Sequence, residues 1–148
     1  MTEPNRMAEP NRMTGRQVAR IILALLFIAG GVVHFVRPAI YDAMIPPILP
    51  WPRFWTLFTG ACEIAGGWGL LVPPLRKAAA YGLIAMLVGF LWVHVRMLVD
   101  PPLWNGQPIP PWVLWARLPL QAVLIWWVYA CGVGSGIEPR RMGEGRSP

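Results

Sequence analysis

Long runs of apolar residues dominate this chain of 148 residues, and charge and proline gather mainly between the runs. Each run holds about 19–22 residues, which at about 1.5 Å per residue matches the roughly 30 Å hydrocarbon core of a membrane. A soluble helical bundle would show polar stripes along these runs, and here they are nearly absent. The pattern therefore predicts an all-α membrane protein, a bundle of four transmembrane helices. The predicted helices are residues 17–36, 54–72, 78–99 and 112–133.

The segments outside this domain, which spans residues 17–133, differ sharply in composition. Residues 1–16 contain a duplicated hexapeptide (TEPNRM, then AEPNRM), with a methionine before the first copy and at the end of each copy. Both this segment and residues 134–148 are polar, contain proline and lack apolar periodicity, which predicts disordered tails.

The connections between the helices are unequal. Residues 37–53 are too apolar to float in water and too rich in proline to form one continuous helix. They predict a short interfacial helix around Ala39–Met44, followed by an extended Pro-rich stretch on the outer membrane surface. The connection before residue 112 has the same character, and Asn105–Gly106 signals a turn there. The connection between the second and third helices, VPPLRK, is minimal.

The distribution of positive charge predicts the orientation. Of the 13 Lys and Arg residues, nine would lie on the side of the termini and four on the other side. The positive-inside rule then places both termini in the cytoplasm. The net charge of +6 is explained by this topology and by contact with anionic lipid, because no basic helix or aromatic RNA-binding pattern indicates a nucleic-acid partner.

Polar residues from all four predicted helices are expected at a similar depth in the outer half of the membrane. Glu63 is the only charge between Arg53 and Arg76. Arg117 is its expected partner, because a guanidinium can bond a carboxylate through two N–H groups. Small residues beside these polar positions predict close helix packing on the same faces. The candidate network or pocket comprises His34, Glu63, His94, Arg96, Arg117 and Gln121.

The helical positions refine this picture. One face of the second predicted helix carries, at helical spacing, Thr56, Thr59, Gly60, Glu63, Gly66 and Gly67. Gln121 and a histidine are expected to support the Glu63–Arg117 pair. His94 and Arg96 are two residues apart, so both cannot point into the centre. Small residues at 82, 85 and 89 share a face with Arg96, which predicts that this face packs against a neighbouring helix.

Four interpretations of the polar residues stay open. They brace the bundle, they line a pocket for a quinone head group or another small amphiphile, they form a proton or ion pathway, or they bind a metal through His34, Glu63 and His94. No catalytic residue is assigned, because the chain lacks recognisable nucleophile, phosphate-binding, dinucleotide and haem-attachment motifs. Cys62 and Cys131 lie at different predicted depths, which argues against a disulfide. Candidate contacts in the outer loops are Tyr41, Asp42, Trp51 and Trp104.

Three stretches resemble the DoxX family, specifically its short DoxX-like branch. They are GGVVHFVRPAIYDAMIPPILP at 30–50, TGACEIAGGWGLLVP at 59–73 and PWVLWARLPLQAVLIWWVY at 111–129. The resemblance extends over roughly residues 18–133. It implies a four-helix bundle in the bacterial inner (plasma) membrane. It also implies association with redox or stress-response complexes, since the founding members are associated with a thiosulfate:quinone oxidoreductase.

Together these observations favour a non-catalytic membrane subunit or scaffold that associates with a redox or stress-response protein partner and binds a quinone or similar amphiphile. An oxidoreductase or isomerase acting on a lipid-soluble substrate is the main alternative. A small transporter is a further alternative and would require a homo-oligomer, because four short helices enclose little lumen.

Overall fold

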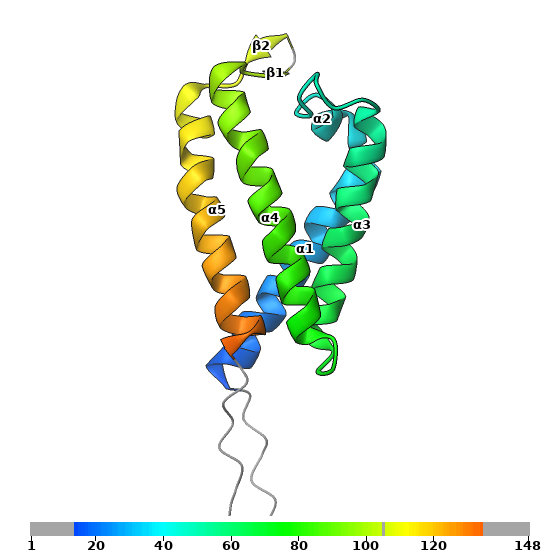
Figure 1. The fold of residues 1–148 in the computed structure, drawn as a ribbon, viewed down its shortest axis with the longest axis vertical. Coiled ribbons are helices and arrows are strands. Elements are labelled where there is room, and N and C mark those ends of the chain that lie inside the picture. Colours follow the sequence, from blue (N-terminus) through cyan, green and yellow to red (C-terminus); the bar gives the residue numbers. More distant parts are fainter. Residues whose placement is uncertain (1–13, 105, 135–148) are drawn as a thin grey trace, which may run out of the picture.

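The computed structural model describes residues 14–104 and 106–134, and they form a mainly helical protein (Figure 1). The elements follow one another as α1 (Gly15–Val36), α2 (Pro38–Asp42), α3 (Pro52–Leu71), α4 (Arg76–Val99), β1 (Leu103–Trp104), β2 (Gln107–Pro108) and α5 (Pro111–Gly132). Of the predicted tails, 1–16 and 134–148, residues 1–13 and 135–148 lie outside the described residues.

Three of the helices, α1, α4 and α5, are long and apolar enough to cross a membrane. These helices have 22, 24 and 22 residues, and each of their ends lies within two residues of the predicted one. Large apolar side chains such as Leu25, Val88 and Trp126 are exposed on their outer surfaces, as expected for helices that face lipid. These features indicate an all-α membrane protein. Helix α3 has 20 residues, and it is not among the three.

The start of α1 lies earlier than predicted. Thr14 caps the helix: its hydroxyl accepts from the backbone N–H of Gln17 at 3.3 Å, and the Gln17 side chain accepts from the Thr14 N–H at 2.8 Å. This reciprocal pair is a capping box, which supplies partners for the free N–H groups at the start of a helix. Gly15 and Arg16 are therefore helical rather than part of a disordered tail.

The segment between α1 and α3 contains the predicted short helix, α2, followed by turns and bends. Two contacts hold this segment on α3. The Arg53 side chain donates to the Asp42 carboxylate at 2.8 Å, and the Trp55 indole donates to the Pro50 carbonyl at 3.0 Å. The connection between α4 and α5 is an antiparallel two-stranded hairpin, which the sequence indicated only by its turn residues; Gly106 there has φ +77°, a conformation that favours glycine.

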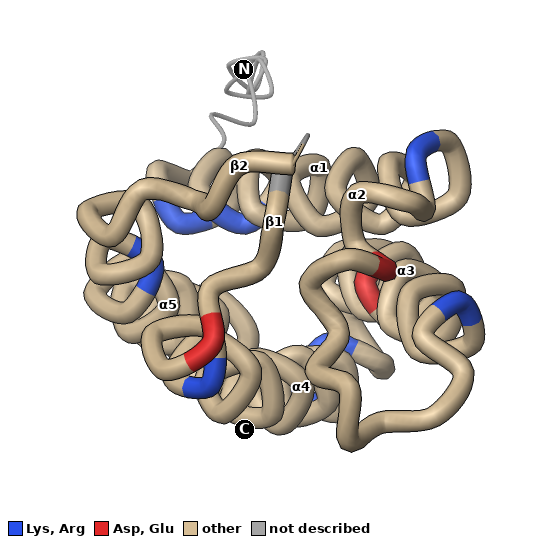
Figure 2. The backbone as a smooth tube through the Cα atoms, turned by 90° about the horizontal axis from the view of Figure 1, so that it is seen from above, with Lys and Arg blue, Asp and Glu red and all other residues tan. Residues whose placement is uncertain are grey.

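The four long helices form a ring when viewed from above, with α1 between α3 and α5 and with α4 on the opposite side (Figure 2). One end of this ring carries α2 and the β-hairpin, and we call it the loop end. The other is the terminal end, where Arg16 of α1 donates to the Gly134 carbonyl at 3.2 Å. An apolar core joins the helices and is formed by Leu23, Ala24, Phe27, Leu70, Ala80, Leu83, Leu87, Val128 and Cys131.

Helices α1 and α3 approach each other at glycines. A Cβ atom added to Gly31 would lie 2.5 Å from the Gly60 carbonyl oxygen, and one added to Gly60 would lie 2.6 Å from the His34 Cβ. The predicted small-residue contact is therefore present on these two helices. The corresponding prediction of close packing is wrong for α4, because a Cβ atom at Gly82 or Gly89 would meet nothing within 4 Å.

Candidate functional site

A cavity of about 310 Å³ lies among the helices near the loop end. We call it the loop-end cavity. All four long helices and α2 contribute to its wall, so it brings together side chains that are far apart in the sequence. Its ionisable lining residues are His34, Tyr41, Glu63, His94 and Arg117, and its other lining residues are Ile40, Met44, Ile45, Thr56, Thr59, Phe90, Val93 and Met97.

His34 is buried on α1 and is held from two sides. Its Nδ1 lies 2.9 Å from the Thr56 carbonyl oxygen and 3.3 Å from the Thr59 hydroxyl. A carbonyl only accepts, so Nδ1 must carry hydrogen and donate to it. The Tyr41 ring of α2 stacks on the imidazole, with ring centroids 3.6 Å apart. These contacts fix the ring so that Nε2 faces the cavity side of α3.

The Thr59 hydroxyl is oriented by its own helix. Its hydrogen is shared between two backbone acceptors, the Trp55 carbonyl at 2.8 Å and the Thr56 carbonyl at 3.1 Å. Its oxygen is then free to accept from His34. The Thr56 carbonyl and the Thr59 hydroxyl thus hold the imidazole in place. The helical spacing of these threonines with Glu63 put them on the correct face but did not reveal this role.

Glu63 pairs with His34 rather than with Arg117. The Glu63 Oε1 lies 3.8 Å from the His34 Nε2, and the Glu63 side chain is 12 % exposed. Gly30 makes room for this carboxylate, because a Cβ atom there would lie 3.0 Å from Oε2. The predicted Glu63–Arg117 ion pair is absent among the described residues, whose other ion pair joins Asp42 and Arg53.

Arg117 instead contacts two thioethers. Its Nη1 lies 3.8 Å from the Met44 sulfur and 3.6 Å from the Met97 sulfur. Thioether sulfur is a weak acceptor, so these contacts leave most of the hydrogen-bonding capacity of a guanidinium unused. Neither methionine had a pattern in the sequence that would mark it as a partner of an arginine.

His94 lines the cavity from α4 and is half-buried. Its Nδ1 is buried and has no hydrogen-bond partner in the part of the chain that the structure describes. Few buried polar atoms in folded proteins lack a partner, so such an atom calls for an explanation. This wall of the cavity therefore carries the N–H donors of Arg117 and a histidine, His94, whose Nδ1 has no partner among the described residues.

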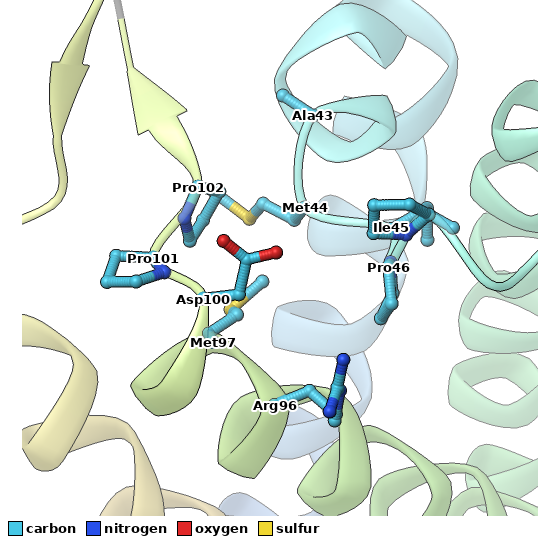
Figure 3. A pocket seen from close by; sticks show the side chains of 10 residues that line it. Ala43, Met44, Ile45, Pro46, Arg96, Met97, Asp100, Pro101 and Pro102 are labelled. Atoms are coloured by element: carbon cyan, nitrogen blue, oxygen red, sulfur yellow. The ribbon is translucent and has the colours of Figure 1, made fainter.

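Two predicted members lie elsewhere. Arg96 is exposed and lines a separate cavity of about 130 Å³ with Asp100, against the loop that carries Met44–Pro46 (Figure 3). Gln121 is buried, but it donates to the Leu87 carbonyl at 2.6 Å and so joins α5 to α4 rather than supporting Glu63. As their spacing predicted, His94 and Arg96 do not both line the loop-end cavity.

The four candidate loop contacts also have different environments. Tyr41 points inward onto His34, and burial together with the Glu63 charge raises the pKa of its phenol. Asp42 is paired with Arg53, Trp51 is 76 % exposed at the start of α3, and Trp104 lies in β1. Among those of the four whose side chains the structure describes, Trp51 is thus the one that is largely exposed.

The arrangement favours binding of a polar group inside an otherwise apolar protein. His34, Glu63 and His94 do not form a cluster that could hold a metal ion, and the residues described by the structure contain no such cluster of three His, Cys, Asp or Glu side chains. The histidine–carboxylate pair on α1 and α3 can accept or donate a proton, while Arg117 can hold an anion or a carbonyl oxygen.

The fold and this site define a helical membrane protein with a polar cavity among its helices. The chain belongs to the family described as Domain of unknown function (DUF8561), which matches residues 23–132. The chain has no match among curated proteins and none among solved structures.

Proposed function

We propose that this protein crosses the bacterial inner membrane four times, with both termini in the cytoplasm. The fourth span is α3, which has 20 residues and packs along α1 through the glycine contact. Its polar side chains at 59 and 63 face the protein interior, where they have partners, and Thr56 is fully buried, so these residues do not prevent insertion. The excess of Lys and Arg on the side of the termini supports this orientation.

We propose that the protein is a non-catalytic membrane subunit of the DoxX type that binds a small amphiphile, such as a quinone, in the loop-end cavity. The observation that carries this proposal is the wall formed by Arg117 and His94, which has buried polar capacity without an oxygen or nitrogen partner among the described residues. Buried ionisable groups that only braced the helices would be expected to pair with each other. A redox or stress-response protein in the same membrane is the proposed partner of this subunit.

An intact-complex mass spectrum of the protein in native nanodiscs tests this proposal. We expect a bound small amphiphile that is lost in Arg117→Gln and retained in Leu120→Gln, a matched change at an exposed position three residues along α5. We also expect a second polypeptide in the complex, and the total mass gives the number of copies. An empty cavity in the wild-type protein would contradict the proposed binding role, and isolation of the fully functional chain alone would contradict the subunit role.

The His34–Glu63 pair favours one alternative, an enzyme that moves a proton on a lipid-soluble substrate. A carboxylate beside an oriented imidazole is a common arrangement for general acid–base chemistry. Under this alternative, Glu63→Gln abolishes turnover while expression and helical content stay at the wild-type level. Equal loss of expression and activity would instead indicate a structural role for the pair.

A further inference from the structure

The loop-end cavity has two walls of different chemical character. On one wall, His34 of α1 and Glu63 of α3 face each other at 3.8 Å. On the other, His94 of α4 and Arg117 of α5 lack a carboxylate partner among the described residues. A ligand that satisfies both walls must offer an acceptor to the guanidinium and must be compatible with a carboxylate nearby.

The Arg117 wall selects the charge of the ligand. A guanidinium is always protonated, and carboxylates match its geometry through two parallel hydrogen bonds. The sulfur atoms of Met44 and Met97 supply only weak acceptors at 3.8 and 3.6 Å. A ligand carboxylate is therefore the partner that Arg117 most clearly lacks, and His94 lines the same cavity.

The His34–Glu63 wall sets a condition on that carboxylate. Because Nδ1 of His34 carries hydrogen, Nε2 presents a lone pair to Glu63 whenever the imidazole is neutral. An ionised Glu63 then faces that lone pair without a hydrogen between them, at the long separation of 3.8 Å. One added proton lets the two side chains move together into a hydrogen bond, and it removes the negative charge that would repel a second carboxylate.

We infer that the loop-end cavity binds an amphiphile with a carboxylic acid head group, which enters as the neutral acid and is held as its anion. The O–H bond of the acid breaks, its proton goes to the position between Nε2 of His34 and the carboxylate of Glu63, and the ligand carboxylate pairs with Arg117 and His94. The charge of the occupied site then equals that of the free site. This inference rests on the proposed function and specifies the ligand class.

Other head groups fit less well. A phosphodiester stays ionised near neutral pH and brings no proton, so Glu63 would remain charged beside it. An ester or alcohol offers no charge to Arg117. The apolar chain of the ligand would contact Ile40, Phe90 and Val93. The ionisable groups facing the site are His34, Tyr41, Glu63, His94 and Arg117, one from each of the five helices.

The test measures binding of dodecanoic acid and of its methyl ester to the full chain in nanodiscs between pH 6 and 9, with empty nanodiscs as the reference. We expect the acid to bind more tightly than the ester. Its affinity should fall as the pH rises, approaching about tenfold per pH unit where one proton enters with each ligand. Arg117→Gln should weaken binding of the acid at least about tenfold, because a charge-assisted hydrogen bond is lost.

The Glu63→Gln variant distinguishes binding with uptake of a proton from binding through attraction to Arg117 alone. Without the carboxylate no proton is needed, so the acid should bind at least as tightly at pH 9 as in the wild type, with a flatter pH profile. Equal binding of acid and ester, or an unchanged pH profile in Glu63→Gln, would overturn the inference. If decylubiquinone binds while the acid binds no better than its ester, the inference fails and the proposed function stands. If none of these amphiphiles binds, both fail.

Discussion

The Glu63 carboxylate lies 3.8 Å from Nε2 of His34, and the opposite nitrogen of the same ring donates to the Thr56 carbonyl at 2.9 Å. One imidazole therefore connects the α3 backbone at Thr56 to the Glu63 side chain, about two helical turns further along α3. The stack with Tyr41 adds a third constraint from α2. The polar neighbour of Glu63 is therefore this oriented imidazole and not the Arg117 guanidinium.

The Nδ1–H donor of His34 predicts a graded effect of two substitutions. His34→Ala removes the ring and its bond to Thr56, and we expect it to lower the free energy of unfolding by about 2–4 kcal/mol. In His34→Asn the side-chain amide nitrogen takes the place of Nδ1, so about 1 kcal/mol of this loss should be recovered. Thermal unfolding in a mild detergent measures both. Equal losses in the two variants would show that the Thr56 bond contributes nothing.

The glycine contact between α1 and α3 predicts a strong dependence on position. Gly31→Ala places a methyl group against the Gly60 carbonyl, a backbone atom that cannot move alone, and we expect a loss of about 1–3 kcal/mol. Gly82→Ala is the matched control, because its methyl group would meet nothing within 4 Å. It should be neutral or stabilising by up to about 1 kcal/mol, since alanine favours helix over glycine. The same unfolding measurement compares them, and a costly Gly82→Ala would contradict the packing described for α4.

Arg117 offers a test between bracing and binding. If the guanidinium serves a ligand and not the fold, Arg117→Met should remove the cost of burying a charge and stabilise the protein by about 1–3 kcal/mol. Methionine also fills the space beside Met44 and Met97 with a flexible apolar chain. Leu120→Met, at an exposed position of α5, should leave the unfolding temperature unchanged. A marked loss of stability in Arg117→Met would indicate that this residue braces the helices.

The membrane crossing of α3 is open to a labelling experiment. Ile48 precedes α3 and Leu75 follows it, and both are exposed, at 73 % and 55 %. We expect Ile48→Cys to react with a membrane-impermeant maleimide in intact spheroplasts, whereas Leu75→Cys should react only after permeabilisation. The wild-type protein supplies the background from Cys62 and Cys131, which are partly buried and buried. Reaction of both variants from the same side would show that α3 does not cross.

The sequence predicted the helices and the short helix after α1 because both depend on local signals. Apolar runs of spanning length and prolines at defined positions act within a few turns, and α1, α4 and α5 follow them closely. The gathering of His34, Glu63, His94 and Arg117 near one end was also predictable, since depth along a helix follows from residue number.

The partner of each polar residue was not predictable in the same way. Helices that are apolar on all sides give little indication of their rotation, and the small residues of α4 suggested a packing face that proved to be exposed. Arg117 was expected to reach Glu63, but α1 already supplies His34 to that carboxylate. The loop after α2 brings Met44 to the guanidinium, and α4 brings Met97. Gln121 likewise bonds the Leu87 carbonyl, an acceptor that every residue carries and that no side-chain pattern reveals.

The central claim is that the loop-end cavity is a binding site, and photolabelling in native membranes tests it most directly. A dodecanoic acid that carries a diazirine on its alkyl chain is activated in the presence and absence of excess unlabelled acid, and the modified residues are mapped by peptide mass spectrometry. The claim predicts that Ile40, Phe90 and Val93 are labelled and are protected by the unlabelled acid. Labelling confined to lipid-facing positions such as Trp126 and Val88, with no protection inside the cavity, would contradict it.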